Sequence, residues 1–536
     1  MTDINKNRIL ALLIFLLGFF LRIQSIDKLP ALNADEAAIG YNAYSLLTTG
    51  KDEHSNPWPL EFQSFNDYKP GIYFYLALPF VGAFGLNVFS VRLPGIILSS
   101  LAIPLVYLLG NELFPSHKIK KNHIEINFGI IPSLLLSVSP WHIHFSRGAW
   151  ETSVATTFLM LGVLIFLKFR GNNKFWLLIP IPFALSMYTY HSMRLIAPLL
   201  GLCLAITYRV DNRKLFFWFV LSSILLFPIF TSVLANKATS RLSGIGITAD
   251  RGPILRAEEL RGDHPKPSLF SKVLHNKYVE YSIRLADNYS RHFNGNFLFT
   301  EGDEIQRNKV PNLGLLYWFE IITVPFGLWE AIRVKSRSQL LLWWLLIAPL
   351  ASSLTFQSPN ALRAENMIVP FVLLSGLGIW KISKKVPIFI FSIFILWSIS
   401  SYLHEYYNYM AKMYPYSSQY GFEEMINFVS QIQDKYEQIF ITTRYDQPYI
   451  LTLFYLKIDP HIFQSDHAIT PKDKYGFSTV EKFGKFNFAE IKWSEAVKKK
   501  NSVIIGTAEE IPNNANIIKK IYFPNGSIAF KIASNL

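Results

Sequence analysis

Two adjacent carboxylates, Asp35 and Glu36, follow the first apolar segment of the chain, in the stretch ALNADEAAIGYNAY (31–44). A carboxylate beside an attacking hydroxyl or amide group can act as a general base. Neighbouring helical residues point about 100° apart, so both carboxylates cannot face the same reacting atom. Asn33 and the two acids also fit a helix N-terminus, where they would only cap the helix. The stretch therefore permits catalysis by one carboxylate and capping or pairing by the other.

A lysine takes a similar place in the stretch SFNDYKPGIYFYLALP (64–79), where Asp67 and Lys69 precede another apolar segment. Pro70 restricts the backbone there, and Gly71 lets it bend. Lysines at helix ends are often lipid-headgroup anchors. An ammonium group can also bind a phosphate, and so Lys69 and Asp67 are candidate substrate-binding residues.

Four further polar clusters lie beside apolar segments. In SPWHIHFSRGAWETS (139–153), Arg147 and Glu151 are four residues apart, so they share a helical face and can pair. His142 and His144 are two apart, a spacing that suits a strand better than a metal site on one helical face. The other candidates are Tyr190, His191 and Arg194 in 188–198, Asp303 and Arg307 in 292–314, and Arg363 in 358–370. Each cluster alone is typical of an interfacial anchor or a local salt bridge.

The segments that must position these residues are strongly apolar. The chain of 536 residues is 51% hydrophobic and 17% charged, and apolar runs recur from residue 8 to residue 402. Many runs are about 16 to 22 residues long, and about 20 helical residues cross a bilayer. The sequence thus predicts a polytopic α-helical membrane protein with about 11–13 transmembrane helices, and it excludes a soluble multidomain protein.

The net charge of +14 comes mainly from short loops between apolar runs, which indicates cytoplasmic loops and not a nucleic-acid surface. With these loops inside the cell, all six polar clusters fall on the outer face of a plasma or inner membrane. The membrane domain then spans 1–402, with outer loops at 25–71 and 236–310. Residues 72–113 are an exception, because they contain two apolar segments where the topology needs a single crossing.

The composition changes after residue 402. Apolar residues at helical spacing in 420–436 predict an amphipathic helix. The runs QIFITT (438–443) and SVIIGT (502–507) indicate short buried strands, and Asn-Gly within 517–532 indicates a hairpin. We therefore expect 403–536 to form a small extracytoplasmic α/β domain.

Together the candidate residues match one kind of chemistry. The cations Lys69, Arg147, Arg194 and Arg363 can neutralise the phosphate of a lipid-linked carrier, while Asp35 removes a proton from the acceptor. The leaving phosphate needs no general acid, and direct displacement inverts the anomeric centre, as in inverting glycosidases. This predicts sugar transfer from a polyprenyl-phosphate donor to a protein, lipid or glycan acceptor at the membrane, without a nucleic-acid partner.

The stretches 33–44, 68–114 and 139–167 resemble the GT-C membrane glycosyltransferases of the protein O-mannosyltransferase and lipid A aminoarabinose transferase group. The resemblance covers about residues 8–170 and extends more weakly to about 400. It implies the GT-C fold, Asp35 as the catalytic acid of an Asp-Glu pair, Glu151 as a second acid, and Lys69 as the carrier-phosphate contact.

The chain departs from that group at two places. In the aminoarabinose transferases a metal-binding Glu directly precedes the lysine, whereas Tyr68 stands here. An Arg also follows their Asp-Glu pair, where this chain has Ala37 and Ala38. The sequence therefore leaves a divalent metal open and names no certain cofactor.

Two other classes of function remain open at the sequence level. A secondary transporter would carry ionisable groups near the membrane midplane, whereas the groups here cluster at helix ends. A non-catalytic membrane scaffold would use the outer domain to hold partners. Replacing Asp35 by Asn separates an enzyme from both.

Overall fold

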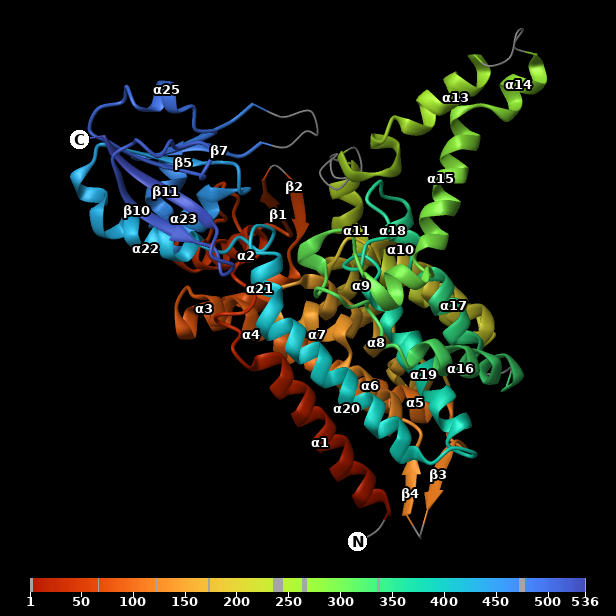
Figure 1. The fold of residues 1–536 in the computed structure, drawn as a ribbon. Helices are drawn as coiled ribbons and strands as arrows, with labels where there is room; N and C mark the ends of the chain where they lie inside the picture. The colour runs from red at the N-terminus through yellow and green to blue at the C-terminus, as the bar shows by residue number, and fades with distance from the viewer. Residues whose placement is uncertain are drawn as a thin grey trace. The chain divides into compact units, whose positions relative to one another are not determined.

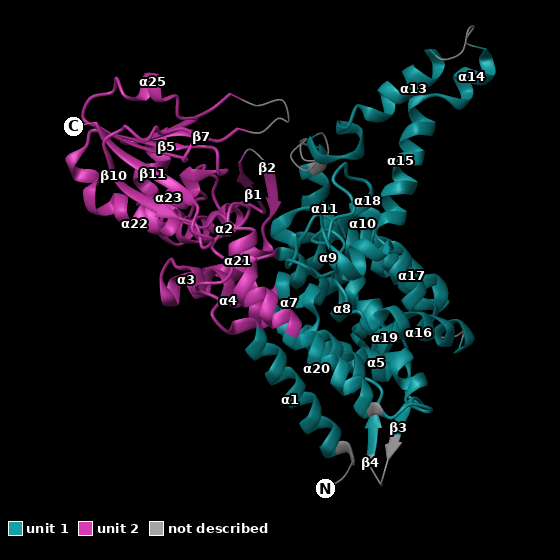
Figure 2. Cartoon of the chain, in the orientation of Figure 1, with its two compact units in different colours: residues 1–21, 98–145, 151–400 teal, residues 22–97, 146–150, 401–536 magenta. Residues whose placement is uncertain are grey.

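Two sets of chain segments form separate compact units in the computed structural model (Figure 2). The structure describes residues 3–65, 67–121, 124–171, 174–234, 244–262, 268–334, 338–471 and 478–535. Unit 1 comprises residues 1–21, 98–145 and 151–400. Unit 2 comprises residues 22–97, 146–150 and 401–536.

Unit 1 is built from helices, shown in teal in Figure 2. Its main helices are α1 (Asp3–Ile23), α5 (Ala102–Leu113), α6 (Ile130–Val138), α7 (Pro140–Arg147), α8 (Glu151–Phe169), α9 (Pro180–Thr189), α10 (Met193–Thr207), α11 (Asn212–Leu234), α13 (Gly252–Gly262), α14 (Leu269–Leu274), α15 (Lys277–Arg291), α16 (Glu320–Val334), α17 (Gln339–Ile347), α18 (Leu350–Ser353), α19 (Ile368–Ile382) and α20 (Ile388–His404). The last residues of α1, α7 and α20 belong to unit 2. A short hairpin of β3 (Lys118–Lys121) and β4 (Ile124–Asn127) connects α5 to α6.

Helix α19 is the buried centre of unit 1, and glycines let α16 approach it closely. A Cβ added at Gly327 would lie 1.8 Å from the Leu374 carbonyl oxygen, and one at Gly378 would lie 1.8 Å from the Thr323 carbonyl oxygen. The Thr323 and Ser375 hydroxyl groups are 2.7 Å apart across the same contact. Small residues and hydroxyl hydrogen bonds are how helices pack in a lipid environment, where burial of apolar area supplies little drive.

Four helical stretches in the described part of the chain are long and apolar enough to cross a membrane: 88–113, 151–169, 212–232 and 365–382. Shorter apolar helices cover Ile72–Phe84, Met193–Thr207 and Gln339–Ser353. The count of about 11–13 membrane crossings stays a prediction. Helices α6 and α7 are separated by Ser139, whose backbone is extended just before Pro140.

Unit 2 contains the sheet that the C-terminal sequence predicts. Its strands run in the order β10-β11-β9-β5-β8-β7-β6, with β5 parallel to both β9 and β8. The strands are β5 (Gln438–Thr442), β6 (His467–Ile469), β7 (Val480–Phe483), β8 (Phe486–Ala489), β9 (Ser502–Gly506), β10 (Ile517–Tyr522) and β11 (Ile528–Asn535). The predicted amphipathic helix forms as α22 (Phe422–Ile432), with Phe422, Met425, Ile426 and Val429 buried. The sheet is therefore confirmed, and its extracytoplasmic location stays a prediction.

The N-terminal part of unit 2 packs on this C-terminal part. Its elements are α2 (Ala34–Thr49), the hairpin β1 (Glu61–Ser64) and β2 (Asp67–Pro70), α3 (Ile72–Phe84) and α4 (Val88–Ser100). Helix α2 lies against α23 (Pro448–Leu456), where a Cβ at Gly40 would lie 2.7 Å from the Phe454 ring. The Tyr41 hydroxyl donates to the Ile458 carbonyl at 3.1 Å. The predicted boundary at residue 402 separates a membrane domain from an outer domain and remains a prediction. By their contacts, residues 22–97 and 401–536 belong to the same compact unit.

Candidate active site

Asp35 and Lys69 meet in unit 2. Asp35 lies in the first turn of α2, and Lys69 lies in β2, where it pairs with Phe62 of β1. The Lys69 Nζ donates to the Asp35 Oδ1 at 2.5 Å. The Lys69 side chain is 9% exposed and that of Asp35 is 29% exposed. Two clusters that are far apart in sequence thus form one ion pair, in which the carboxylate is the more accessible group.

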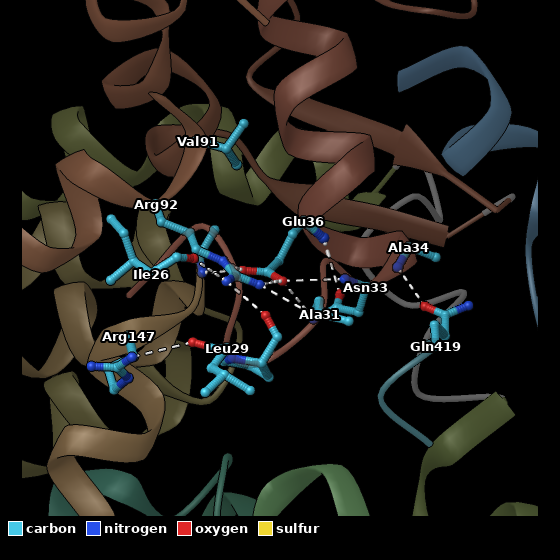
Figure 3. A network of polar contacts seen from close by, with 12 residues as sticks. Ile26, Leu29, Ala31, Asn33, Ala34, Glu36, Val91, Arg92, Arg147 and Gln419 are labelled. Carbon is cyan, nitrogen blue, oxygen red and sulfur yellow. Dashed lines mark hydrogen bonds and ion pairs between the residues drawn. The ribbon is translucent and has the colours of Figure 1, made fainter. Parts of the chain in front are cut away.

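Glu36 has a different environment from its neighbour. It completes a capping box with Asn33, whose side chain accepts from the Glu36 N–H while the Glu36 carboxylate accepts from the Asn33 N–H. Its two oxygens also accept from Arg92, at 2.7 Å from Nε and 2.6 Å from Nη2 (Figure 3). The Ala149 N–H donates to Glu36 Oε1 at 2.8 Å. Glu36 is 1% exposed, so its carboxylate fixes the start of α2 and does not face solvent.

Two buried arginines hold the loop that precedes α2. Arg92 Nη1 donates to the carbonyl groups of Ile26 at 2.5 Å and Pro30 at 2.9 Å. Arg147 Nη2 donates to the carbonyl groups of Gln24 at 2.6 Å and Leu29 at 3.2 Å, the latter contact being visible in Figure 3. Arg147 was predicted as a phosphate contact, and in this structure its guanidinium binds backbone carbonyl groups and the Tyr406 hydroxyl.

A buried acid lies near the Asp35–Lys69 pair. Glu53 is fully buried, and its backbone N–H donates to the Asn42 Oδ1 of α2 at 2.9 Å. Burial and the nearby Asp52 raise the pKa of Glu53 to about 8, against the charge of Lys69, which lowers it. Burial lowers the pKa of the adjacent His54 to about 4, and its Nε2 lies 3.5 Å from the Glu53 Oε1. Both groups are therefore mostly uncharged at neutral pH.

In unit 1, the segment 358–365 gathers three of the predicted clusters. The Ala361 N–H donates to Asp303 Oδ2 at 2.6 Å, and Asp303 also accepts from Ile305 and Asn308. The Thr152 hydroxyl at the start of α8 donates to the Leu362 carbonyl at 3.0 Å. Burial raises the pKa of Asp303, whereas these hydrogen bonds and the charge of Arg363 lower it. Asp303 thus fastens its loop to 358–365.

The remaining predicted residues of unit 1 have the following positions. Tyr190 and His191 lie in the turn between α9 and α10, and Arg194 lies in the first turn of α10. Glu151 is the first residue of α8. Arg307 lies in a short 3₁₀ helix, and its carbonyl oxygen is 2.9 Å from the Nε2 of His144. Arg363 is half-buried and donates to the Thr355 hydroxyl at 2.9 Å and the Gln357 carbonyl at 3.2 Å. Asp67 is the first residue of β2, and its side chain lies outside the described part of the structure.

The structure thus brings the predicted residues together in two groups. Asp35, Glu36, Lys69 and Arg147 lie in unit 2, while the others with described side chains lie in unit 1. Among the residues that the structure describes, no three His, Cys, Asp or Glu side chains converge to hold a metal ion. Tyr68, in the place of the metal-binding Glu of the resembled transferases, does not fit such a ligand.

Sequence reasoning missed three residues of unit 2. Arg92 carried a signal, because a charged side chain inside the apolar run FSVRLPGII demands a partner. Glu53 carried a weaker one, as part of the ionisable run Asp52-Glu53-His54. Gln419 carried none: its Oε1 accepts from the Ala34 N–H at 2.7 Å (Figure 3). Its Nε2 donates to the Tyr445 carbonyl at 2.8 Å.

Comparisons with known proteins agree with this architecture. Residues 12–226 match the family model of dolichyl-phosphate-mannose-protein mannosyltransferases. No curated protein matches the chain. The structure of ArnT from Cupriavidus metallidurans bound to undecaprenyl phosphate is similar with a TM-score of 0.53 at 11% identity, covering 98% of both chains. The apo form of the same ArnT gives a TM-score of 0.53 at 11% identity, covering 100% of this chain and 99% of that one.

The family match includes the stretches that contain Asp35, Lys69 and Glu151. The structural match extends along nearly the whole chain, including the C-terminal sheet. The chain therefore has the helical GT-C fold, and its resemblance to GT-C membrane glycosyltransferases is confirmed.

Proposed function

We propose that this protein is a membrane glycosyltransferase that transfers a sugar from a polyprenyl-phosphate carrier to an acceptor at the outer face of the cell membrane. The observation that carries the proposal is the 2.5 Å contact between Asp35 and Lys69. It joins a base and a phosphate-binding cation at the start of α2. The family match over residues 12–226 supports a lipid-linked donor, because that family is described by its dolichyl-phosphate-mannose substrate.

In the proposed reaction, Lys69 exchanges Asp35 for the carrier phosphate when the donor binds. The ammonium then neutralises the phosphate oxygens, and Asp35 is freed to hydrogen-bond an acceptor hydroxyl or amide. The acceptor oxygen or nitrogen attacks the anomeric carbon, the bond from that carbon to the phosphate oxygen breaks, and Asp35 takes the acceptor proton. The carrier phosphate leaves with the bonding electrons, and the anomeric centre is inverted.

Glu36 and Arg92 have a positioning role in this proposal. Their bidentate ion pair is buried and fixes the turn in which Asp35 lies. A catalytic group needs such support, because a displacement of about 1 Å can cost two orders of magnitude in rate. The unit 1 residues stay predictions from the sequence: Arg194 and Arg363 as phosphate-binding residues, Tyr190, His191, Asp303 and Arg307 as substrate-binding residues, and Glu151 as a second acid.

Asp35→Asn tests the base. We expect transfer of radiolabelled sugar from a polyprenyl-phosphate donor to the acceptor fraction of membranes to fall at least about 100-fold, the usual contribution of a general base. The control is Asp27→Asn, because Asp27 is an exposed carboxylate in the loop before α2. Wild-type transfer by the folded Asp35→Asn protein would contradict the mechanism and favour a scaffold.

A further inference from the structure

A second candidate site lies in the C-terminal sheet of unit 2. A pocket of about 410 Å³ is lined by Tyr416, Arg444, Tyr445, Thr507, Ala508, Glu509 and Ile528. This volume is within the range of small-molecule sites, about 300–1,000 Å³. The lining combines two aromatic rings with a guanidinium, a carboxylate and a hydroxyl group.

The topology of the sheet explains why a pocket forms there. Arg444 and Tyr445 follow β5, and Thr507, Ala508 and Glu509 follow β9, its parallel neighbour. After β5 the chain continues to β6, β7 and β8 on one side, whereas after β9 it continues to β10 and β11 on the other (Figure 1). Chain connections that leave neighbouring strands in opposite directions open a crevice at their carboxyl ends, which is where open α/β sheets bind ligands.

The buried carboxylate of Glu510 joins the strand ends beside the crevice. Glu510 accepts from the Thr442 hydroxyl at 2.9 Å and the Ile491 N–H at 3.0 Å through Oε1. Its Oε2 accepts from the Thr507 N–H at 2.8 Å. These three donors lie at the carboxyl ends of β5, β8 and β9, so one side chain joins the three strand ends. A preformed crevice loses little conformational entropy when it binds a ligand.

The lining groups suit a neutral sugar. The Tyr416 and Tyr445 rings are 5.1 Å apart at 74° and provide apolar faces against which the C–H face of a sugar ring can pack. Arg444 Nη1 donates to Glu509 Oε2 at 2.6 Å, and planar pairs of this kind can hydrogen-bond adjacent hydroxyl groups. Glu490 also lies 4.0 Å from Arg444, so two carboxylates face its guanidinium and disfavour a phosphate there.

The crevice is connected to the first turn of α2 within unit 2. Gln419 donates to the Tyr445 and Asp446 carbonyl groups at 2.8 and 3.3 Å, and it accepts from the Ala34 N–H at 2.7 Å. Ala34 directly precedes Asp35. One side chain therefore joins the wall of the crevice to the turn that carries the proposed base.

We propose that this crevice binds a neutral oligosaccharide and that the acceptor of the transfer reaction is therefore a glycan. Naming the acceptor rests on the proposed function, whereas glycan binding by the crevice does not. Sugar rings pack on Tyr416 and Tyr445, and hydroxyl groups bond to the Arg444–Glu509 pair.

Binding to an array of neutral and anionic oligosaccharides tests the proposal with the full-length protein in lipid nanodiscs. Wild type should retain neutral glycans, and Tyr416→Ala and Glu509→Ala should each weaken that binding at least 10-fold. Tyr522→Ala is the matched control, because Tyr522 of β10 is 53% exposed, against 54% for Tyr416, and does not line the crevice. Both tyrosines are exposed, so neither replacement should prevent folding, which thermal unfolding would verify.

Three results would overturn the proposal: retention of no neutral glycan by wild type, equal retention by the Tyr416→Ala variant, or binding restricted to anionic glycans. Asp35→Asn should bind glycans as wild type does while losing transfer, so a failure of the crevice and a failure of the catalytic assignment are distinguishable.

Discussion

The buried side chain of Glu53 makes the stability of the folded protein depend on pH. Its pKa is raised to about 8 in the folded protein, from an ordinary value near 4.5. A carboxyl group that folding keeps protonated stabilises the protein fully below its unfolded pKa, and this contribution is lost as the pH rises through the folded pKa. The pKa of His54 is lowered to about 4. Its contribution to stability is therefore present above about pH 6.5 and is lost as the pH falls.

Glu53→Gln should therefore remove the part of the stability loss that Glu53 causes as the pH rises. Between about pH 4.5 and 8, wild type should lose up to about 1.4 kcal/mol of unfolding free energy per pH unit relative to this variant. Chemical denaturation in detergent at several pH values measures the difference. Glu423→Gln, at an exposed position of α22, is the control and should leave the slope unchanged. Parallel profiles for wild type and Glu53→Gln would disprove the assigned protonation.

At the level of elements, the position of α2 depends on the Glu36–Arg92 pair. The side chains of Glu36 and Arg92 are 1% and 0% exposed. The two residues are 56 positions apart in the sequence and lie on different helices, α2 and α4. Removing one partner of a buried ion pair leaves the other charge uncompensated, which costs about 3–5 kcal/mol. Removing Arg92 would also leave the carbonyl groups of Ile26 and Pro30 without their hydrogen bonds to its Nη1.

Arg92→Met should accordingly lower the unfolding free energy by about 3–5 kcal/mol. It should also lower transfer activity, because the first turn of α2 is no longer held. Lys492→Met is the control: Lys492 and its partner Glu495 are 71% and 72% exposed, and such pairs contribute about 0–1 kcal/mol. Equal stability of the two variants would show that the pair does not fix α2.

The sequence predicted some elements well because their signals are local. The strands at 438–442 and 502–506 follow from short apolar runs, and the hairpin of β10 and β11 follows from Asn-Gly. Features that depend on contacts between distant segments could not be predicted from the sequence. The pairing of Arg92 with Glu36 depends on contacts between distant segments, and nothing local to 22–97 indicates that α2 packs on α23 in the C-terminal part of the chain. Asp35 and Lys69 were found through the resemblance, and their roles stay a proposal.

At the level of the whole molecule, the proposal requires the predicted topology. The N-terminal loop and the C-terminal sheet must both face outward, and the basic hairpin of β3 and β4 must face the cytoplasm. In a Cys203→Ser background, single cysteines at Asp27, Lys519 and Lys118 report on these three regions. An impermeant maleimide should label positions 27 and 519 in intact cells and position 118 only after permeabilisation. Labelling of 27 and 519 from opposite sides would exclude the proposed orientation.

The central claim is that Lys69 and Asp35 bind the two partners of one transfer reaction. A cryo-electron microscopy map of the protein with a bound polyprenyl phosphate tests it most directly. We expect a phosphate oxygen about 3 Å from the Lys69 Nζ, with the Asp35 carboxylate turned away from the lysine. A phosphate bound elsewhere, with the 2.5 Å contact between Asp35 and Lys69 unchanged, would contradict the account.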